Sequence, residues 1–431
     1  MKLTAISKLK FKRKSTIQGF VVSIRNKTNI AFLVVKDFSS KIQITINKTI
    51  TPQFNELIDR LTIQSVITVV GQMHENPQVK LNGREFIPSK IILETKAATP
   101  LPVDDNSLLD QRLDYRWIDL RSERNQLIFK VQTVLTNYFR EFLLKHGFVE
   151  IHTPKLIATA SESGSDLFEI SNYFDKKAYL AQSPQFYKQM AIAAGFEKVF
   201  ECGPVFRAEK SRSNRHGTEF VGFDLEFYNV ESVIDVMRFE EAMIRYAFKK
   251  LQKKYGADIK RVFAIELKLP VGKFPIMNLK DIYQELKQRY NYYVPEVEQT
   301  DLNAEGEKLA NQLAIEKFNS EFLFVVGYDK ATRPFYHARD AQGNPQGYDL
   351  IYRGVEITSG AKREHRYDQL VKQAQEKGLD KDVRFYLDFF KYGIAPHGGF
   401  GIGLDRITML ILGITIKEAM LCFRGPDRLV P

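Results

Sequence analysis

Apolar and polar residues alternate in short runs over the first part of the chain, a pattern typical of half-buried strands. Five such runs lie at residues 17–24, 30–36, 41–47, 66–73 and 87–94. A helical pattern at residues 52–61 separates the third run from the fourth. Five strands with one helix after the third is the order of an OB-fold barrel, a fold that commonly binds oligonucleotides. We therefore predict this barrel over residues 1–95.

The pattern changes after a proline-containing break, within a linker that we predict at residues 96–110. Apolar residues then recur at helical spacing over residues 123–145 and again over residues 231–255. The segment at about residues 256–325 is rich in helical pattern and shows little chemistry, as expected of an insertion. The last hundred residues return to strands and glycines. These patterns predict a second domain over residues 111–431.

Positive charge is concentrated at the N-terminal end of the chain. Lys and Arg outnumber Asp and Glu by 63 to 52, and the first 36 of the 431 residues contain no acidic residue. This bias indicates a polyanionic partner such as nucleic acid. A solvated lysine face is the alternative interpretation of the same residues.

Cysteines are few and long apolar runs are absent from the sequence. Cys202 and Cys422 lack metal-ligand spacing, which argues against a disulfide framework or a zinc site. We expect both in apolar strands, as small hydrophobic residues. No run of about 18 apolar residues is present, so we expect no membrane partner. The chain shows no secretory signal pattern, and we expect it in the cytoplasm.

Arginines in two distant segments suit a bound polyphosphate. The first segment, residues 206–220, contains FRAE followed by Arg215-His216 and Phe220, and the second, residues 401–406, reads GIGLDR. The planar arginine fork pairs with phosphate oxygens and keeps its charge. The two segments resemble motifs 2 and 3 of the class II aminoacyl-tRNA synthetases. Surface arginines in unrelated elements are the alternative.

This resemblance implies an ATP site, with ATP as a substrate. By the resemblance, Arg207 would contact the α-phosphate and the substrate carboxylate, and Arg406 would reach the γ-phosphate. These two arginines are the implied catalytic residues. Phe220 would stack on the adenine. The other residues implied at the nucleotide are Glu209, Arg215, His216 and Glu356.

The predicted helix at residues 123–145 is followed by a strand at residues 148–151 and by Pro154. This order resembles motif 1 of the same family, which lies in the dimer interface, and it implies a homodimer. The resemblance also implies an antiparallel sheet flanked by helices in the catalytic domain. The expected fold class is therefore α+β, with an N-terminal OB-fold barrel.

Two carboxylates in the run YDLIYRGVEI, Asp349 and Glu356, are candidate ligands of Mg²⁺. An odd spacing in one strand would place them on opposite faces, but Gly354 favours a break between two segments. Mg²⁺ is commonly held by one or two carboxylates together with substrate phosphates. Next to Arg406 in the family pattern, we expect metal binding; salt-bridged strand acids are the alternative.

Two further segments indicate the amino acid. Residues 182–189, QSPQFYKQ, and 359–365, SGAKREH, resemble the QSPQxxK and SGxxR segments of aspartyl-tRNA synthetases. By this resemblance, Lys188 and Arg363 would pair with the aspartate side chain. An asparagine amide would leave buried charge unpaired, at a cost of roughly 2–5 kcal/mol. The other residues implied at L-aspartate are Glu162, Ser183, Gln185, Arg207, Asp224 and Ser359. Ser163 departs from the Glu-Gly-Gly loop of the family.

The resemblance covers nearly the whole chain and is closest to the compact archaeal and eukaryotic-like form of class IIb. Arg333 begins an RPFY run typical of aspartyl enzymes, and the C-terminal residues match their pattern except at Gly425. An aspartate–tRNA ligase is thereby implied, which activates L-aspartate with ATP and transfers it to the 3′ end of tRNA. An asparaginyl-tRNA synthetase and a non-catalytic RNA-binding paralogue are the alternatives. Lys188 disfavours the first, and the intact arginines and carboxylates disfavour the second.

In the predicted barrel, Phe32 and Gln43 match anticodon-reading positions of the family. An exposed aromatic ring would stack on a base, for about 1–3 kcal/mol; alternatively, Phe32 belongs to the core. Lys80 matches a position that accompanies strict anticodon choice, whereas Val22 matches neither the strict nor the relaxed pattern. The expected RNA partner is tRNA-Asp, with tRNA-Asn left open.

Overall fold

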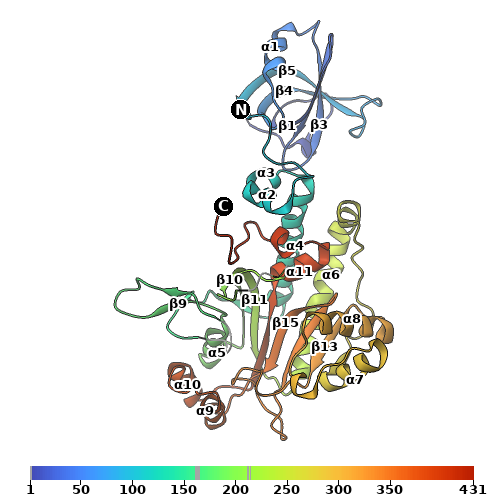
Figure 1. Cartoon of the computed structure of the whole chain (residues 1–431). Coiled ribbons are helices and arrows are strands. Elements are labelled where there is room, and N and C mark those ends of the chain that lie inside the picture. Colours follow the sequence, from blue (N-terminus) through green and yellow to red (C-terminus); the bar gives the residue numbers. More distant parts are fainter. Residues whose placement is uncertain (1, 161–165, 211–212, 214) are drawn as a thin grey trace. The chain divides into compact units, whose positions relative to one another are not determined.

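The computed structural model describes residues 2–160, 166–210, 213 and 215–431 (Figure 1). The chain divides into two compact units, Met1–Asp104 and Asp105–Pro431. The division falls within the segment expected to be a linker, and the first helix of the second unit, α2 (Leu109–Asp114), already begins inside that segment. No helix in the described part of the chain is long and apolar enough to cross a membrane.

The N-terminal unit is a closed five-stranded barrel, as predicted. Its strands follow the order β1-β2-β3-β5-β4 around the barrel. A short 3-10 turn and helix α1 (Asn55–Arg60) separate the third strand from the fourth. The strands are β1 (Lys14–Asn26), β2 (Ile30–Lys36), β3 (Lys41–Asn47), β4 (Val66–Glu75) and β5 (Arg84–Thr95).

Alternation along each strand separates the barrel core from its outer surface. In β2, Ala31, Leu33 and Val35 are fully buried, whereas Phe32 between them is half-buried and faces outward. The apolar positions recognised in the sequence therefore form the inner face of the barrel. The interpretation of Phe32 as a core residue is not supported, because it lies on the outer face of β2.

An eight-stranded sheet forms the centre of the second unit, and it is antiparallel except at its two edges, where β12 pairs with β13 and β6 with β10 in parallel. The predicted antiparallel sheet is therefore confirmed, with parallel edge strands in addition. In spatial order the strands are β12 (Ile276–Asn278), β13 (Phe322–Val326), β14 (Gly347–Tyr352), β15 (Val355–Lys362), β16 (His397–Gly403), β11 (Glu219–Tyr228), β10 (Lys198–Phe206) and β6 (Val149–Glu150). A small second sheet contains β7 (Leu156–Ile157), β9 (Ala178–Leu180) and β8 (Glu169–Ile170).

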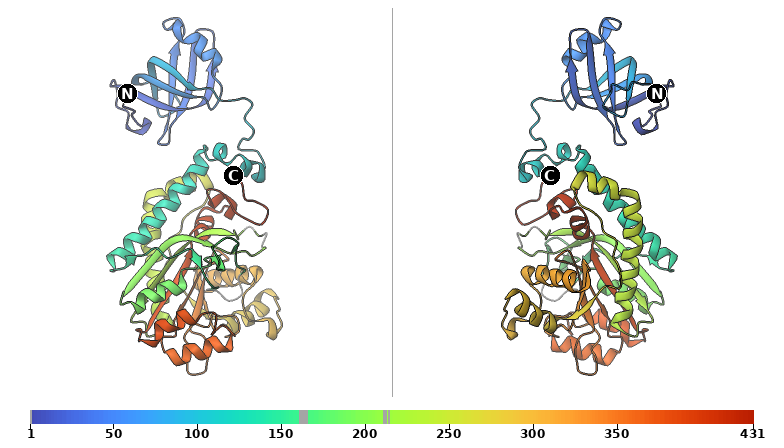
Figure 2. Two further views of the ribbon diagram at one scale, coloured as in Figure 1. Left: turned by 90° about the vertical axis from the view of Figure 1, so that its left-hand side faces the viewer. Right: turned by 90° about the vertical axis from the view of Figure 1, so that its right-hand side faces the viewer.

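Two long helices, α4 (Glu123–Lys145) and α6 (Val233–Phe263), pack side by side and bury their apolar stripes against the sheet (Figure 2). Helix α4 has the predicted bounds. Helix α6 runs past the predicted end at residue 255, because the buried Ile259 continues its apolar stripe. Further helices of this unit are α3 (Arg116–Asp119), α5 (Gln185–Ala193), α7 (Leu279–Tyr290), α8 (Ala304–Phe318), α9 (Tyr367–Glu376), α10 (Arg384–Lys391), α11 (Leu404–Leu412) and α12 (Ile416–Ala419).

Two expectations from the sequence need correction. The segment at about residues 256–325 is helix-rich, but it also contributes β12 to the edge of the main sheet, so it is built into the fold. Cys202 lies in β10 as expected, whereas Cys422 is exposed and lies outside the strands. The chain around Cys422, just after α12, forms a bend, whereas we expected an apolar strand at this position.

Candidate active site

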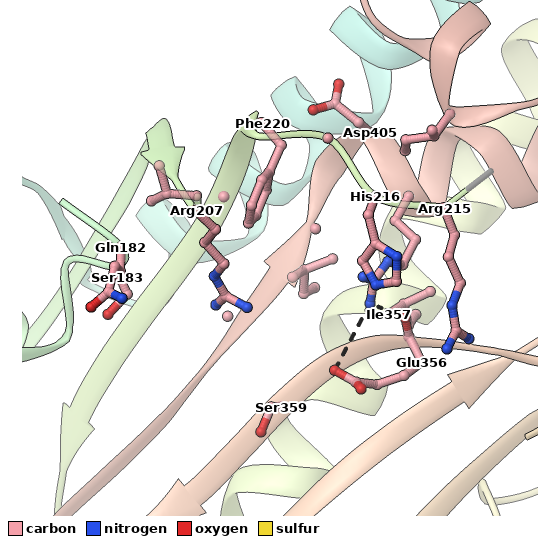
Figure 3. Close-up of a pocket in the computed structure, with 18 of the residues that line it drawn as sticks. Gln182, Ser183, Arg207, Arg215, His216, Phe220, Glu356, Ile357, Ser359 and Asp405 are labelled. Atoms are coloured by element: carbon pink, nitrogen blue, oxygen red, sulfur yellow. Dashed lines mark hydrogen bonds and ion pairs between the residues drawn. The ribbon is translucent and has the colours of Figure 1, made fainter. Parts of the chain in front are cut away.

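A pocket of about 140 Å³ lies over the central strands β10, β11, β15 and β16 (Figure 3). Arg207, Arg215 and His216 point into the same space from one side, and Glu356 faces them from β15. Segments almost two hundred residues apart in the sequence therefore meet at one site. The predicted residues that line the pocket are Ser183, Arg207, Glu209, Arg215, His216, Phe220, Asp224, Glu356, Ser359 and Arg406.

Arg207 follows the end of β10 and enters the pocket with one donor unsatisfied. Its backbone N–H donates to the Thr218 oxygen at 2.9 Å, while its buried Nε has no hydrogen-bond partner. The guanidinium carbon lies 5.5 Å from the centre of the Phe220 ring, within reach of a cation–π attraction. A buried cationic donor without an acceptor is unfavourable. An anionic ligand in the pocket would satisfy it.

Two further arginines bring positive charge to the pocket, which Glu209, Asp224, Glu356 and Asp405 also line. Arg406, in the first turn of α11, donates from Nη1 to the Glu356 backbone oxygen at 2.7 Å and lies 3.9 Å from the Glu356 carboxylate. Arg215 forms an ion pair with Glu307 at 2.7 Å. Burial and the positive charges of Arg406, Arg215 and Arg207 lower the pKa of His216 to about 4. His216 is therefore neutral at physiological pH, which leaves the arginines as the cations available to a polyphosphate.

The candidate metal ligands lie on two strands joined by a tight turn. Arg353 and Gly354 both have positive φ, 48° and 78°, and connect β14 to β15, so the expected break is present. Asp349 does not line the pocket, and both of its carboxylate oxygens accept hydrogen bonds from Arg333. The structure thus brings Glu356 and Ser359 to the pocket, whereas Asp349, opposite Ser359 on the neighbouring strand, forms a salt bridge with Arg333.

The residues present at this point suit a divalent cation. Burial and the nearby charge of Asp349 raise the pKa of Glu356 to about 7, and a cation at its carboxylate would oppose that shift. The described residues contain no cluster of three or more His, Cys, Asp or Glu side chains that could hold a metal ion by themselves. The donor set therefore fits Mg²⁺ held by Glu356 together with phosphate oxygens.

Next to this pocket, two cations and two carboxylates form a buried network. Lys188 of α5 contacts Asp224 at 3.1 Å, and Arg363, just after β15, donates from Nε to Glu226 at 3.0 Å. Glu226 is fully buried and lies 3.7 Å from Lys188. Gln185 belongs to the same network, since it donates to Glu226 at 3.2 Å and accepts from Arg363 at 3.1 Å. In this arrangement the two cations and two carboxylates balance one another.

Asp224 connects the network to the pocket. Asp224 and Glu226 are two residues apart in β11, so their side chains lie on the same face. The Asp224 carboxylate packs between the backbones of Gly222 and Gly401, where an added Cβ would approach it to 2.7 and 2.6 Å. Only glycine leaves room for the carboxylate at these two positions. Glu162, which was also expected here, lies outside the described residues.

The candidate anticodon residues lie on the barrel. Phe32 is opposite Thr45, and Val34 is opposite Gln43, so Phe32 and Gln43 are diagonal neighbours on the outer face of β2 and β3. The Gln43 amide donates to the Thr45 hydroxyl at 3.1 Å. Lys80 is exposed in the loop between β4 and β5.

Comparison with known proteins identifies the family. Residues 109–423 match the tRNA synthetases of class II for D, K and N, and residues 15–93 match the OB-fold nucleic acid binding domain. The chain belongs to the class II tRNA synthetases. The resemblance recognised in motifs 1 to 3 is thereby confirmed.

Relatives of this class II synthetase share its full length. It is 40% identical to an aspartate–tRNA(Asp/Asn) ligase of Methanopyrus kandleri, over 96% of this chain and 95% of that protein. It is also 40% identical to an aspartate–tRNA(Asp) ligase of Pyrococcus abyssi, over 97% and 96% of the two chains. Both members of the family thus align with the barrel as well as the catalytic unit.

Solved structures include relatives with either amino-acid specificity. The asparaginyl-tRNA synthetase of Pyrococcus horikoshii, complexed with asparaginyl-adenylate, is 30% identical, with a TM-score of 0.92 and full coverage of both chains. The aspartyl-tRNA synthetase of Entamoeba histolytica is 32% identical, with a TM-score of 0.86, over 100% of this chain and 93% of that one. The fold alone therefore does not separate the two specificities.

Three residues of this synthetase site were missed by the sequence analysis. Glu226 could have been found from its spacing to Asp224 in an apolar strand. Glu307 of α8 binds Arg215 and accepts from the Glu356 backbone N–H at 3.0 Å, although its segment was thought to show little chemistry. Asp405 accepts from the backbone N–H of Val221 at 3.0 Å and so links α11 to β11. The last two contacts join distant segments, which no local pattern shows.

Proposed function

We propose that this class II synthetase is an aspartate–tRNA ligase that activates L-aspartate with ATP and then transfers it to tRNA. One observation carries the proposal for the first step: the buried Nε of Arg207 has no acceptor in a pocket that also contains Arg215 and Arg406. Three arginines around one space suit the phosphates of ATP. The names of the full-length relatives support aspartate as the amino acid.

In the proposed first step, the α-carboxylate of aspartate attacks the α-phosphorus of ATP, and the bond to pyrophosphate breaks. Arg207 holds the α-phosphate and the attacking carboxylate, and Arg406 neutralises the leaving phosphates. Phe220 stacks on the adenine. Mg²⁺ at Glu356 would supply further positive charge to the phosphates. In the second step, a hydroxyl of the terminal ribose of tRNA attacks the aspartyl carbonyl, and AMP leaves.

Recognition of the aspartate side chain is assigned to Lys188 and Arg363. Because Asp224 and Glu226 already pair with these cations, the substrate carboxylate would enter a site where the cations are held in place. The substrate ammonium would be bound by Asp224, which is the carboxylate of the network that lines the pocket. An asparagine amide would bring no charge to this site.

The decisive experiment compares amino acids in ATP–pyrophosphate exchange. The purified chain should support exchange with L-aspartate and not with L-asparagine. Exchange with asparagine instead would assign it the activity named for the solved relative from Pyrococcus horikoshii. No exchange with either amino acid would remove the proposed function and favour a non-catalytic paralogue.

The choice of tRNA is proposed separately, from Lys80 in the exposed β4–β5 loop. A cation near an anticodon base could favour the acceptor atoms of one base over another. We expect charging of tRNA-Asp in preference to tRNA-Asn, and a narrower difference in Lys80→Pro. Equal charging of the two tRNAs by the unmodified chain would contradict this preference and leave aspartate activation untouched.

A homodimer is also proposed. The last turn of α4 and the segment after it expose Leu144, Val149 and Leu156, each about half accessible. These side chains lie at and just beyond the end of the helix that resembles the dimer-forming motif, and a partner subunit would bury them. Sedimentation of the purified chain should give twice the monomer mass, and Val149→Glu should shift it to the monomer.

A further inference from the structure

The N-terminal unit contains a second, strongly cationic surface. A groove of about 880 Å³, here called the β4 groove, runs over the first part of β1, β4 and β5. No acidic residue belongs to its lining. The lining residues are Lys2, Thr4, Lys8, Lys10, Arg13, Lys14, Ser15, Thr16, Val70, Ser89 and Lys90.

The cations of the β4 groove are presented by an anchored segment. Ile6 and Leu9 are buried in the barrel core, and the Ile6 backbone N–H donates to Asp37 at 2.7 Å. The Lys12 backbone N–H donates to the Met73 oxygen of β4 at 2.9 Å. The lysines between these anchors therefore project from a folded backbone. A ligand that binds them does not have to order a disordered tail.

The β4 groove is separate from the face assigned to the anticodon. Strands follow each other around the barrel in the order β1-β2-β3-β5-β4, which places β4 opposite the β2–β3 pair. Phe32 and Gln43 lie on the outer face of β2 and β3. None of the residues that line the groove belongs to β2 or β3, so the groove and the Phe32 face have no residue in common.

Charge in the β4 groove is not neutralised by the protein. Within the described part of the chain, none of its six cations, Lys2, Lys8, Lys10, Arg13, Lys14 and Lys90, forms an ion pair. Like charges gathered in one concave surface repel one another, and an anionic ligand would relieve this repulsion. The hydroxyls of Ser15 and Ser89 already donate to the oxygens of Arg13 and Val70, at 3.3 and 3.1 Å, so the charged side chains are the main donors for anionic oxygens.

The shape of the surface favours a chain of phosphates over a single anion. A second hollow of about 300 Å³ shares Lys14 and Ser89 with the β4 groove and continues along β4 to Gln72 and His74. The lining of the β4 groove contains no aromatic side chain on which a base could stack. Its residues suit contact with the backbone and offer little means of reading bases.

From this combination we propose that the β4 groove binds the phosphodiester backbone of an RNA strand, independently of base sequence and of the Phe32 face. The cations line a concave groove, which a narrow phosphodiester chain can enter. A membrane is broad and would instead contact a convex face of the protein, so the ligand is a nucleic-acid backbone. The proposal does not depend on the amino-acid specificity proposed above.

The test uses the full chain and a fluorescent 15-nucleotide oligoadenylate, whose binding is followed by anisotropy over a range of salt concentrations. The triple variant Lys10→Ala, Lys14→Ala, Lys90→Ala should bind the probe at least tenfold more weakly. The slope of log Kd against log salt concentration should fall by about 2, from roughly 0.7 per lost phosphate contact on a single strand. Aspartate-dependent pyrophosphate exchange should not change, which reports that the variant is folded.

Two controls make the result specific. The triple variant Lys249→Ala, Lys253→Ala, Lys260→Ala removes the same charge from exposed positions of α6 and should bind the probe normally. Phe32→Ala should also retain binding. Unchanged affinity of the groove variant, or an equal loss in the α6 variant, would overturn the proposal. Binding to phosphatidylserine vesicles without binding to the oligonucleotide would overturn it as well and assign the groove to a membrane surface.

Discussion

The buried network beside the pocket makes a quantitative prediction for Glu226→Gln. This change keeps the shape of the side chain and removes one negative charge. Arg363 would lose the carboxylate at 3.0 Å from Nε, whereas Lys188 would keep Asp224 at 3.1 Å. Burial alone would raise the pKa of Glu226, but Arg363 and Lys188 outweigh it and hold that pKa below its usual value. The carboxylate is therefore charged in the native protein.

Breaking a buried ion pair by removing one partner costs about 3–5 kcal/mol. Arg363 would still donate to Gln185 and to the Gly399 oxygen, both at 3.1 Å, so we expect the lower end, about 3 kcal/mol. For a domain of several hundred residues, this corresponds to a fall in Tm of roughly 6 °C. A bound aspartate would return a carboxylate to Arg363. The rise in Tm caused by aspartate should therefore be larger in Glu226→Gln than in the unmodified chain.

Differential scanning fluorimetry with and without saturating aspartate measures both effects. Glu201→Gln is a matched control, because Glu201 is a buried carboxylate of the sheet that pairs with Lys155 at 2.8 Å outside the network. It should lower Tm without changing the increment from aspartate. An unchanged Tm in Glu226→Gln, or a lower Tm with an ordinary aspartate increment, would refute the assigned role of Glu226 in holding Arg363.

Four other substitutions test three separate parts of the molecule. Arg207→Ala or Arg406→Ala should reduce aspartate-dependent pyrophosphate exchange by two or more powers of ten, in line with about 3 kcal/mol for one transition-state charge contact; near-normal exchange in either folded variant would exclude that arginine. Phe32→Ala should weaken aminoacylation, with pyrophosphate exchange unchanged, since stacking on a base contributes about 1–3 kcal/mol; a parallel loss of exchange would contradict this. Burial raises the pKa of Glu240, which accepts from the Tyr348 hydroxyl at 2.6 Å, from its usual 4.5 to about 8. Because the folded state holds this proton more tightly, its stabilising effect is complete below about pH 4.5 and is lost as pH rises through 8. Urea unfolding should show a steeper fall in stability between about pH 4.5 and 8 in the unmodified chain than in Glu240→Gln, and equal slopes over this range would disprove the raised pKa.

Much of the fold could be predicted from local patterns in the sequence. The period-2 runs gave the barrel strands, and the helical stripe gave α4 with its observed bounds, because burial of one face dictates these patterns. The end of α6 was missed because Gly256, a poor helix former, interrupts a stripe that Ile259, Val262 and Phe263 continue. The parallel edge pairing of β12 was not predictable, since it depends on which distant strand it meets.

The candidate site, like the fold, could be predicted from the sequence only in part. Arg207, Arg406 and Glu356 stand in runs whose residue types suggest phosphate chemistry, and the structure places them around one pocket. Asp349 has an equally suggestive position, but Arg333 occupies its carboxylate. Glu307 of α8 contacts Arg215 and the Glu356 backbone only because the chain brings these distant segments together. The partner of a charged side chain is a property of the tertiary structure, and sequence spacing does not specify it.

The balanced network of Lys188, Asp224, Glu226 and Arg363 has a consequence for protein engineering. Replacement of one cation to admit a neutral amino acid would leave a carboxylate buried without its counterion. A redesign of the specificity would therefore have to exchange acids and bases together, as coupled substitutions. Library searches that vary one position at a time would reject each half of such a pair, although the combined variant could fold.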